Sequence, residues 1–465
     1  MNIGFISLGC SKNLVDTEMM IGIFKDKEYT IVSDPAKADI ILINTCGFID
    51  KSKEEAIDTI LEMAKYKENG KCKLLIATGC LVERYKDELV KLLPEVDIFM
   101  KYKDYAEENK DSNIAINKMF DEIDTLLKKK NSNKKEEGKN KEKSKEKVNN
   151  NDRLDFLNRV YTTGDTYEYI RISEGCDNRC TYCAIPYIRG RFVSRKIEDI
   201  VEEAKKIGKS GRTEIILIGQ DTSKYGIDIY GKPVLDKLLK ELVKINTIKR
   251  IRFLYTYPED ISDSLIDVVK NEKKICKYFD IPIQHISDSV LRRMNRKTNS
   301  ENIKNVINKL RKNIPGVVIR STVMVGFPGE TEEDFNELYD FIKEYKFDKL
   351  GAFSYSKEEG TPAARIKEQI NGNTKRARYN KIMKLQKAIS NEKEEELIGK
   401  EFEILVEGFS EDGIYLVGRT YMDSPDIDGL AYIINEDPDV DESIIGKYVK
   451  AKVVDTDDYD IICRR

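Results

Sequence analysis

The sequence predicts an α/β protein with a small all-β region at its C-terminal end. Two observations predict the α/β part: from residue 1 to 100, and again from 160 to 390, apolar strand-like runs alternate with amphipathic helix-like stretches. A third predicts the all-β part, because residues 400–465 contain short alternating strands separated by turn residues. At 465 residues, the chain is long enough for about three domains.

The first region, residues 1–125, is expected to be a Rossmann-like domain with a mostly parallel sheet. Ser11 and Asp50 are polar residues placed to cap the first two long helices. The expected strands are 2–8, 39–44, 73–77 and 96–100. The expected helices are 12–24, 51–66 and 83–92.

A charged linker is predicted over residues 126–155. Its central stretch, residues 128–147, holds ten Lys, four Glu and no apolar residue. Such a segment has nothing to bury, so it is expected to be disordered. Two interpretations are open: a solvated linker, or a basic segment that binds RNA and tethers the protein to it.

The central region, residues 156–394, is expected to form a partial (βα)6 barrel. Its strands are predicted at 167–172, 214–218, 250–255, 279–283, 317–325 and 350–355. In barrels of this kind the chemistry lies at the C-terminal ends of the strands.

The last region, residues 395–465, is predicted to be a small antiparallel barrel of OB-like type. Four strands are expected, in the stretches EFEILVEGF, GIYLVGRTY, LAYIIN and YVKAKVVD. From residue 401 onward this region holds 17 Asp or Glu against six Lys or Arg, whereas the whole chain has a net charge of only −3. The C-terminal barrel is therefore strongly acidic.

The amino-acid composition limits the kinds of catalytic and metal site that the chain can form. His285 is the single histidine and there is no tryptophan, so a His-based zinc site or Ser-His triad would depend on one residue. No apolar run approaches the roughly 18 residues that span a bilayer, and the start lacks a basic segment typical of a signal peptide. We therefore expect a cytoplasmic protein without a membrane partner. Nine cysteines, an odd number, favour metal or redox chemistry over disulfides.

Cys176, Cys180 and Cys183 form a C-x3-C-x2-C motif directly after the first predicted barrel strand. Three thiolates on one tight loop can hold three irons of a cubane iron–sulfur cluster, which leaves the fourth iron open for another ligand. A structural zinc site would want a fourth ligand nearby. An iron–sulfur cluster is the favoured interpretation, with zinc or incidental thiols as alternatives.

With an aromatic residue, Tyr182, before the last cysteine, this motif resembles the signature of radical S-adenosylmethionine (SAM) enzymes. The resemblance implies that SAM binds the open iron and is cleaved to methionine and a 5′-deoxyadenosyl radical, which abstracts hydrogen from an unactivated carbon. A partly closed barrel suits this chemistry because it keeps solvent away from the radical.

Three further thiols follow predicted parallel strands in the N-terminal region: Cys10 after NIGFISLG, Cys46 after DIILINT and Cys80 after KLLIATG. The C-terminal ends of parallel strands lie along one edge of a sheet, so these residues are expected to converge. A second three-thiolate cluster is the favoured interpretation. The alternative is that they are buried hydrophobes, as expected for the remaining cysteines, which lack this context: Cys72, Cys276 and Cys463.

Two such clusters in this order resemble the methylthiotransferase family over nearly the whole chain. The resemblance implies an N-terminal methylthiotransferase domain, a radical SAM core and a C-terminal TRAM barrel. It implies two [4Fe-4S] clusters and two SAM molecules per product, with the second cluster handling the sulfur. A flavodoxin or ferredoxin is the natural electron donor.

The family divides by substrate, which is either a tRNA adenosine or an aspartate of ribosomal protein S-twelve. Several stretches resemble the ribosomal-protein branch: SLGCSKNLVDTE, NTCGFIDKSKEEAIDTI, GCLVERYKDEL, DTSKYGIDIYG, DIPIQHISDSVLRRMNRKT and GRTYMDSPDIDGLAYI. Charge supports the same branch, because an acidic barrel, with DSPDIDG near its middle, would repel tRNA and attract a basic protein. Acidity that serves solubility alone is the alternative.

Other candidates lie on predicted strand ends. Gln220 is a candidate contact for the amino group of SAM. Gly326 and Gly329 are candidates for a loop that faces the adenosine of SAM, and the alternative for these two glycines is a plain strand-to-helix turn. His285 and Arg191 are candidate substrate-binding residues, with structural roles as the alternatives. Methylthiolation of the protein aspartate competes with tRNA modification and with a non-catalytic iron–sulfur or RNA-binding scaffold.

Overall fold

The computed structural model describes residues 1–101, 110–132, 156–436 and 439–465. These residues form two compact units. One contains Met1–Thr162 together with Ala184–Gly190, and the other contains Thr163–Cys183 with Arg191–Arg465. Within the described ranges, no helix combines the length and apolar character needed to cross a membrane.

The N-terminal unit is built on a five-stranded parallel sheet, as predicted. The strand order is β2-β1-β3-β4-β5. The bounds are β1 (Asn2–Ser7), β2 (Thr30–Ile31), β3 (Ile40–Thr45), β4 (Leu74–Gly79) and β5 (Ile98–Phe99). Ser7 pairs with Asn44, and Asn44 with Thr78, so β1, β3 and β4 end at nearly the same level.

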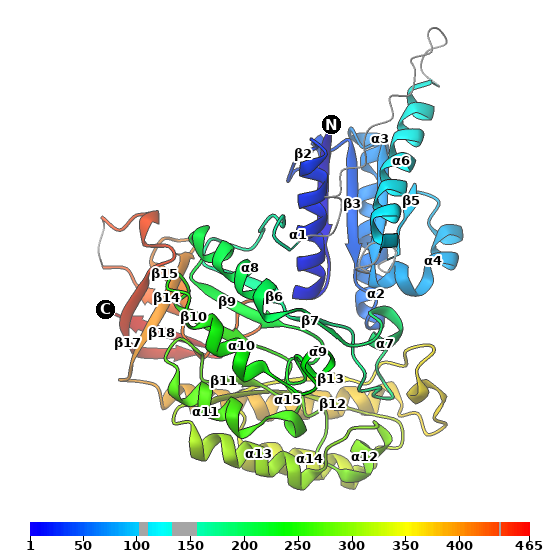
Figure 1. Cartoon of the computed structure of the whole chain (residues 1–465). Coiled ribbons are helices and arrows are strands. Elements are labelled where there is room, and N and C mark those ends of the chain that lie inside the picture. The colour runs from blue at the N-terminus through cyan, green and yellow to red at the C-terminus, as the bar shows by residue number, and fades with distance from the viewer. Residues whose placement is uncertain (102–109, 133–155, 437–438) are drawn as a thin grey trace. The chain divides into compact units, whose positions relative to one another are not determined.

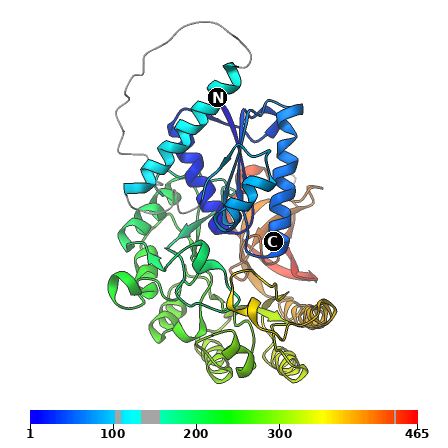
Figure 2. The same ribbon diagram turned by 90° about the vertical axis from the view of Figure 1, so that its right-hand side faces the viewer.

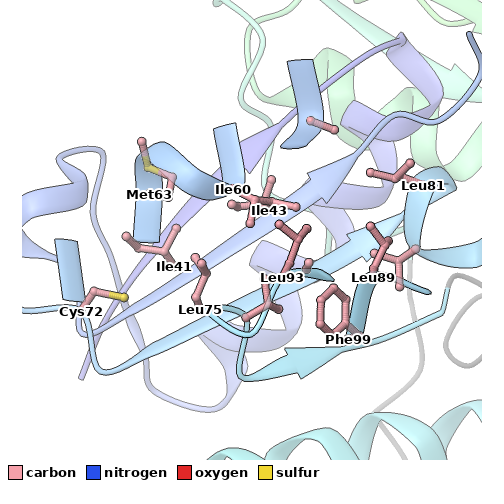
Figure 3. Packing of buried hydrophobic residues seen from close by; sticks show 14 of the residues in the cluster. Ile41, Ile43, Ile60, Met63, Cys72, Leu75, Leu81, Leu89, Leu93 and Phe99 are labelled. Carbon is pink, nitrogen blue, oxygen red and sulfur yellow. The ribbon is translucent and has the colours of Figure 1, made fainter. Parts of the chain in front are cut away.

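Helices cover both faces of this sheet. On one face, α1 (Ser11–Asp26) and α6 (Lys110–Ser132) pack on Ile3, Leu42 and Ile76; Figure 1 shows α6 in cyan beside the blue strands, and Figure 2 shows the same helix after a 90° turn. On the other face lie α2 (Asp50–Ala64) and α4 (Cys80–Leu92), with the short α3 (Tyr66–Asn69) and η1 (Pro35–Lys37) in the connections. Figure 3 shows the apolar contacts of this second face.

Two details of the prediction are wrong. Ser11 and Asp50 are the first residues of their helices rather than the caps, because the chain is still extended at Cys10 and Ile49 and turns one residue later. The hydroxyl of Ser52 accepts a hydrogen bond from the backbone N–H of Ile49 instead.

In addition, α6 continues to Ser132, into the predicted disordered linker. The rest of that linker, residues 133–155, lies outside the described residues.

The second unit contains the six predicted parallel strands. They form two three-stranded sheets, β10-β9-β6 and β11-β12-β13. The backbone N–H of Thr256, after β10, donates to the carbonyl oxygen of Asp280 in β11 at 2.8 Å, so the two sheets continue into each other as a partial barrel. The bounds are β6 (Tyr167–Arg171), β9 (Glu214–Ile218), β10 (Arg250–Phe253), β11 (Tyr278–Asp280), β12 (Val318–Val325) and β13 (Lys349–Ser354).

Helices connect these strands. The long ones are α8 (Ile197–Lys209), α10 (Leu235–Leu242), α11 (Asp263–Asn271), α13 (Ser300–Asn313), α14 (Glu332–Tyr345) and α15 (Gly372–Glu395). The short elements are β7 (Ser173–Glu174), β8 (Val193–Ser194), α9 (Ile227–Tyr230), η2 (Pro258–Asp260), α12 (Asp288–Arg293) and η3 (Pro362–Arg365).

The C-terminal segment forms a closed five-stranded barrel in the order β14-β15-β16-β18-β17. Its elements are β14 (Glu401–Phe409), β15 (Tyr415–Arg419), β16 (Ala431–Ile434), η4 (Glu442–Ile444), β17 (Tyr448–Asp457) and β18 (Asp460–Arg464). The barrel fold is confirmed, but β18 was not predicted. The expected antiparallel pairing fails at one seam, because β16 and β18 pair in parallel to close the barrel.

Buried charges join this barrel to the N-terminal ends of core strands. Glu214, the first residue of β9, binds Arg419 of β15 at 2.9 Å (Oε2 to Nη2) and Arg252 at 3.2 Å (Oε1 to Nε). Burial alone would raise the pKa of Glu214, but the surrounding arginines hold it at about 2. The catalytic ends of such strands are the opposite, C-terminal ends, so the barrel is attached away from them.

The acidic run DSPDIDG takes part in the same attachment. Asp423 is buried and pairs with Lys349 at 3.2 Å. Asp428 accepts a hydrogen bond from the hydroxyl of Tyr278 at 2.6 Å. Asp426 accepts hydrogen bonds from two tyrosines of β6 but is exposed. Part of the run is thus engaged within the unit, and its predicted role as a surface for a basic partner stays a prediction.

Candidate functional site

The three N-terminal thiols converge at the sheet edge, as the sequence predicted. Cys10 precedes α1 and is exposed, whereas Cys46 follows β3, Cys80 begins α4, and both are buried. Burial raises the pKa of the Cys80 thiol to about 11; Arg189 lowers it, and the charges of Cys10 and Cys46 raise it. The influence of Cys10 and Cys46 on Cys80 places all three sulfurs near one another.

Glycines permit this close approach. Gly9 has a φ of +89°, and a Cβ on it would lie 2.7 Å from the Cβ of Cys46. Gly79 has a φ of +96°, and a Cβ there would lie 2.4 Å from the carbonyl oxygen of Thr45. Any side chain at these positions would push the cysteine-bearing loops apart.

Asn13, fully buried on α1, ties the three loops together. Its Nδ2 donates to the carbonyl oxygens of Leu8 at 2.9 Å and Thr45 at 3.1 Å. Its Oδ1 accepts a hydrogen bond from the thiol of Cys80 at 3.6 Å. One amide thus bonds to each of the segments that carry Cys10, Cys46 and Cys80. The sequence interpretation missed this residue.

Arg189 completes the N-terminal group. It is the C-cap residue of the short helix α7 (Ile185–Ile188). This helix lies in the segment Ala184–Gly190, which folds as part of the N-terminal unit. Its Nη1 donates to Asp16 Oδ2 at 2.6 Å, and its Nη2 lies 3.5 Å from the Cys80 sulfur. Ala184 and Ile188 pack beside Cys80 in a small apolar cluster.

The C-x3-C-x2-C loop lies in the second unit, at the C-terminal end of β6. Cys176 and Cys180 are buried, and Cys183 is half-buried. Asn178 holds the loop to the end of β9 through a 2.7 Å hydrogen bond from Nδ2 to Asp221 Oδ2. Thr181 donates from Oγ1 to the carbonyl oxygen of Arg293 at 2.8 Å. The loop is therefore fixed by two of its own side chains, which bond to groups outside the motif.

An aromatic and cationic wall borders Cys180. The hydroxyl of Tyr257 lies 4.0 Å from the Cys180 sulfur, and the Arg296 guanidinium stacks on the Tyr257 ring at 4.2 Å from its centroid. Burial raises the pKa of the Tyr182 hydroxyl, Cys180 raises it further, and Arg296 lowers it. Tyr182, chosen from the motif, is thus placed beside the thiols, and Arg296 and Tyr257 are additional neighbours.

Buried polar atoms without a hydrogen-bond partner mark the C-terminal ends of four core strands in the described part of the chain. They are Ser173 Oγ after β6, Gln220 Oε1 after β9, Gln284 Oε1 after β11 and Tyr355 OH after β13. The amide nitrogen of Gln220 donates to Glu174 Oε1 at 2.7 Å, so its oxygen is the atom left over. A polar ligand would satisfy these atoms, whose isolation is otherwise costly.

The predicted glycine turn also follows a core strand. Gly326 and Gly329 both have positive φ, of 71° and 77°, after β12. Thr331 and Asp334 form a capping box at the start of α14 (Glu332–Tyr345). Backbone geometry explains both glycines, and no described contact distinguishes a ligand-facing loop from a plain turn.

His285 lies beside the C-terminal end of β11. Its side chain is fully buried, and Nδ1 accepts a hydrogen bond from the backbone N–H of Ser287 at 3.0 Å. Its Nε2 is a further buried atom without a hydrogen-bond partner in the described part of the chain. Burial lowers its pKa to about 3, so the imidazole is neutral at physiological pH. Its role as a pocket residue stays a prediction.

Arg191 and the remaining cysteines have simpler surroundings. The Arg191 side chain is 86% exposed and lies 3.9 Å from Asp177. Cys72, Cys276 and Cys463 are buried, as expected for structural thiols. Among the described residues, no three His, Cys, Asp or Glu side chains are arranged around a single metal ion. A cubane cluster needs a different arrangement of ligands, because each thiolate binds a different iron atom.

Three family models match the chain. The uncharacterized protein family UPF0004 matches residues 2–101, the radical SAM superfamily 170–342 and the TRAM domain 398–465. A solved structure with a similar fold is the radical SAM methyltransferase TsrM from Kitasatospora setae, with cobalamin and a [4Fe-4S] cluster bound. Its TM-score is 0.52 at 13% identity, over 78% of this chain and 76% of that chain. This likeness concerns the fold alone.

Similar curated relatives carry the name ribosomal protein uS12 methylthiotransferase RimO. The relative from Alkaliphilus oremlandii is 52% identical over 461 residues, which cover 99% of this chain and 98% of that protein. The relative from Acetivibrio thermocellus is 48% identical over 464 residues, with 99% and 97% covered. The predicted family resemblance is therefore confirmed over the full length.

Asn13→Ala should loosen the N-terminal site. The substitution leaves the Leu8 and Thr45 carbonyl oxygens without their donor, and each buried unsatisfied group costs about 1–3 kcal/mol. We expect a lower melting temperature of the metal-free protein and a lower iron content after reconstitution. Asn69→Ala, at an exposed asparagine of the same unit, is the control. Equal behaviour of the two variants would contradict the role given to Asn13.

Proposed function

Since the chain belongs to the RimO family of radical SAM methylthiotransferases, we propose that it transfers a methylthio group to ribosomal protein uS12. The observation that carries this proposal is the identity of about half of all residues with uS12 methylthiotransferases from end to end. The acceptor is the Cβ of an aspartate side chain, and two SAM molecules are consumed per product.

The C-x3-C-x2-C loop holds the first [4Fe-4S] cluster through Cys176, Cys180 and Cys183. When bound, the cluster and SAM supply the 5′-deoxyadenosyl radical that removes hydrogen from the acceptor carbon. The chain's own contribution is to fix the thiolates through Asn178 and Thr181 and to place Tyr182 beside them. Half-buried Tyr257 and buried Arg296 cover this side of Cys180 and limit the access of water.

SAM binds across the C-terminal ends of the core strands. The support is the set of buried polar atoms left without partners there, including Gln220 Oε1. Gln220 is the proposed contact for the amino group of SAM, and the turn of Gly326 and Gly329 is the proposed neighbour of its adenosine. Arg191, exposed on the segment after the cysteine loop, is the proposed partner of the acceptor carboxylate.

Cys10, Cys46 and Cys80 hold the second [4Fe-4S] cluster, through which the sulfur is delivered. The fit of the residues supports this assignment, because three thiols meet at one sheet edge that two glycines keep narrow. Cys10 is exposed, so the site is open to a reaction partner on one side. The two clusters require an electron donor, for which a flavodoxin or ferredoxin is proposed.

The C-terminal barrel provides a docking surface for the basic substrate protein. With Asp423 and Asp428 engaged inside the unit, the surface that remains is formed by Asp426 and by exposed carboxylates on other loops and strands. They include Glu411, Asp412, Asp441, Glu442, Asp455 and Asp457. Because phosphate contacts dominate RNA affinity, this surface disfavours tRNA as a substrate.

Mass spectrometry of uS12 tests the proposed substrate. In cells that contain the gene, the aspartate-containing peptide should carry the added mass of a methylthio group, and in cells without the gene it should not. Nucleoside analysis of tRNA from the same cells is the second arm. An unchanged uS12 together with a lost methylthioadenosine would contradict the proposal and establish the tRNA alternative.

Cys10→Ala should separate the two stages of the reaction. The first cluster site is intact in this variant, so reductive cleavage of SAM should continue, whereas methylthio transfer should be lost. Cys176→Ala should abolish both, and Cys72→Ala, at a buried cysteine outside both groups, should retain both. Product formation at the normal rate by Cys10→Ala would show that Cys10 has no part in sulfur delivery.

A further inference from the structure

The side chain of Arg189 has an environment that the cluster assignments do not explain. It is 2% exposed, and its ion-pair partner Asp16 is 1% exposed. Burying an arginine and a carboxylate together is costly unless further hydrogen bonds hold the pair. Here Nη1 donates to Asp16 Oδ2 at 2.6 Å and Nη2 to Asn13 Oδ1 at 2.5 Å. The guanidinium is thus fixed in one orientation.

That orientation directs an N–H group at a cluster ligand. The Nη2 atom that donates to Asn13 also lies 3.5 Å from the sulfur of Cys80, within the range of an N–H···S hydrogen bond. Asn13 itself bonds to the segments before Cys10 and Cys46. The arginine is therefore attached to the same frame that positions the three thiols.

A cubane held by three thiolates is an anion, and it becomes more negative when reduced. Hydrogen bonds to its sulfurs and nearby positive charge set the reduction potential of such a cluster. An anion in a buried site also needs a compensating cation. Within the N-terminal unit, the described cation that contacts one of the three thiols is Arg189.

We propose that Arg189 is a positioning residue of the second cluster: clamped by Asp16 and Asn13, it donates a hydrogen bond to the Cys80 sulfur and raises the potential of the cluster. This inference rests on the proposed function, which places a cluster on Cys10, Cys46 and Cys80. It extends the reaction machinery to a residue outside both cysteine groups, on the segment directly after Cys183.

The test is an EPR-monitored redox titration of the full-length chain carrying Cys176→Ala, Cys180→Ala and Cys183→Ala, so that only the second cluster assembles. Asp16→Asn leaves the arginine charge uncompensated and should make the midpoint potential less negative. Asp16→Asn with Arg189→Met removes both charges and the N–H···S donor, and should make the potential more negative. A structural role alone gives no such opposite shifts.

Two further variants complete the design. Arg189→Lys keeps the charge and a donor, so its potential should lie nearer to the parent than that of the double variant. Lys37→Met, at an exposed cation of the same unit, should leave the potential unchanged. Equal potentials in every variant would overturn the role of Arg189. If the parent itself held no cluster, the failure would instead be that of the proposed second cluster.

Discussion

The N-terminal site depends on one constraint, which is that β1, β3 and β4 pair in parallel and end in step. Ser7, Asn44 and Thr78 lie side by side across the three strands. Each chain segment then turns into its next element within a few residues, and a cysteine occupies each turn. Residues that are 34 to 70 positions apart in sequence are thereby brought to one edge without any direct link between them.

Asn13 and the glycines convert this proximity into a defined site. Strand register alone leaves the three loops free to move, whereas one buried amide bonded to all three restricts them. The same amide accepts a hydrogen bond from Arg189. The polar residues buried along α1 thus act as a second layer behind the thiols, in the way that second-layer groups orient metal ligands elsewhere.

In the second unit, the cysteine loop and the acidic barrel are attached to opposite ends of the core strands. Asn178 fixes the cysteine loop to Asp221, after β9, whereas Arg419 binds Glu214, the residue that begins β9. A substrate held by the barrel would therefore be recognised at a distance from the chemistry. Under the proposed function, affinity for the substrate protein and the choice of the reacting carbon would then depend on different parts of the unit.

Much of this organisation could be predicted from the sequence. A strand followed by a cysteine can be recognised from a short stretch of sequence, and the C-terminal ends of parallel strands always lie along one edge of a sheet. The convergence of Cys10, Cys46 and Cys80 could therefore be predicted. Asn13 was not found as a site residue, and Arg189 was not connected with the N-terminal thiols, because their partners depend on the tertiary fold. Adjacent buried polar residues on α1 were the available signal for Asn13.

One expectation was limited by side-chain direction. DSPDIDG looked like free acidic surface throughout, since the sequence does not show that Lys349 and Tyr278 lie against it. Asp423 and Asp428 are engaged within the unit, whereas Asp426 stays exposed. The position along the chain was right, and the direction of each side chain decided how much acidic surface remains.

Counting iron and sulfide on anaerobically purified protein tests the central claim most directly, which is that two cysteine groups each hold a cubane. The account predicts about eight of each per chain, falling to about four when Cys10, Cys46 and Cys80 are replaced by alanine. About four of each in the unaltered chain, with no loss on replacing those three cysteines, would contradict it.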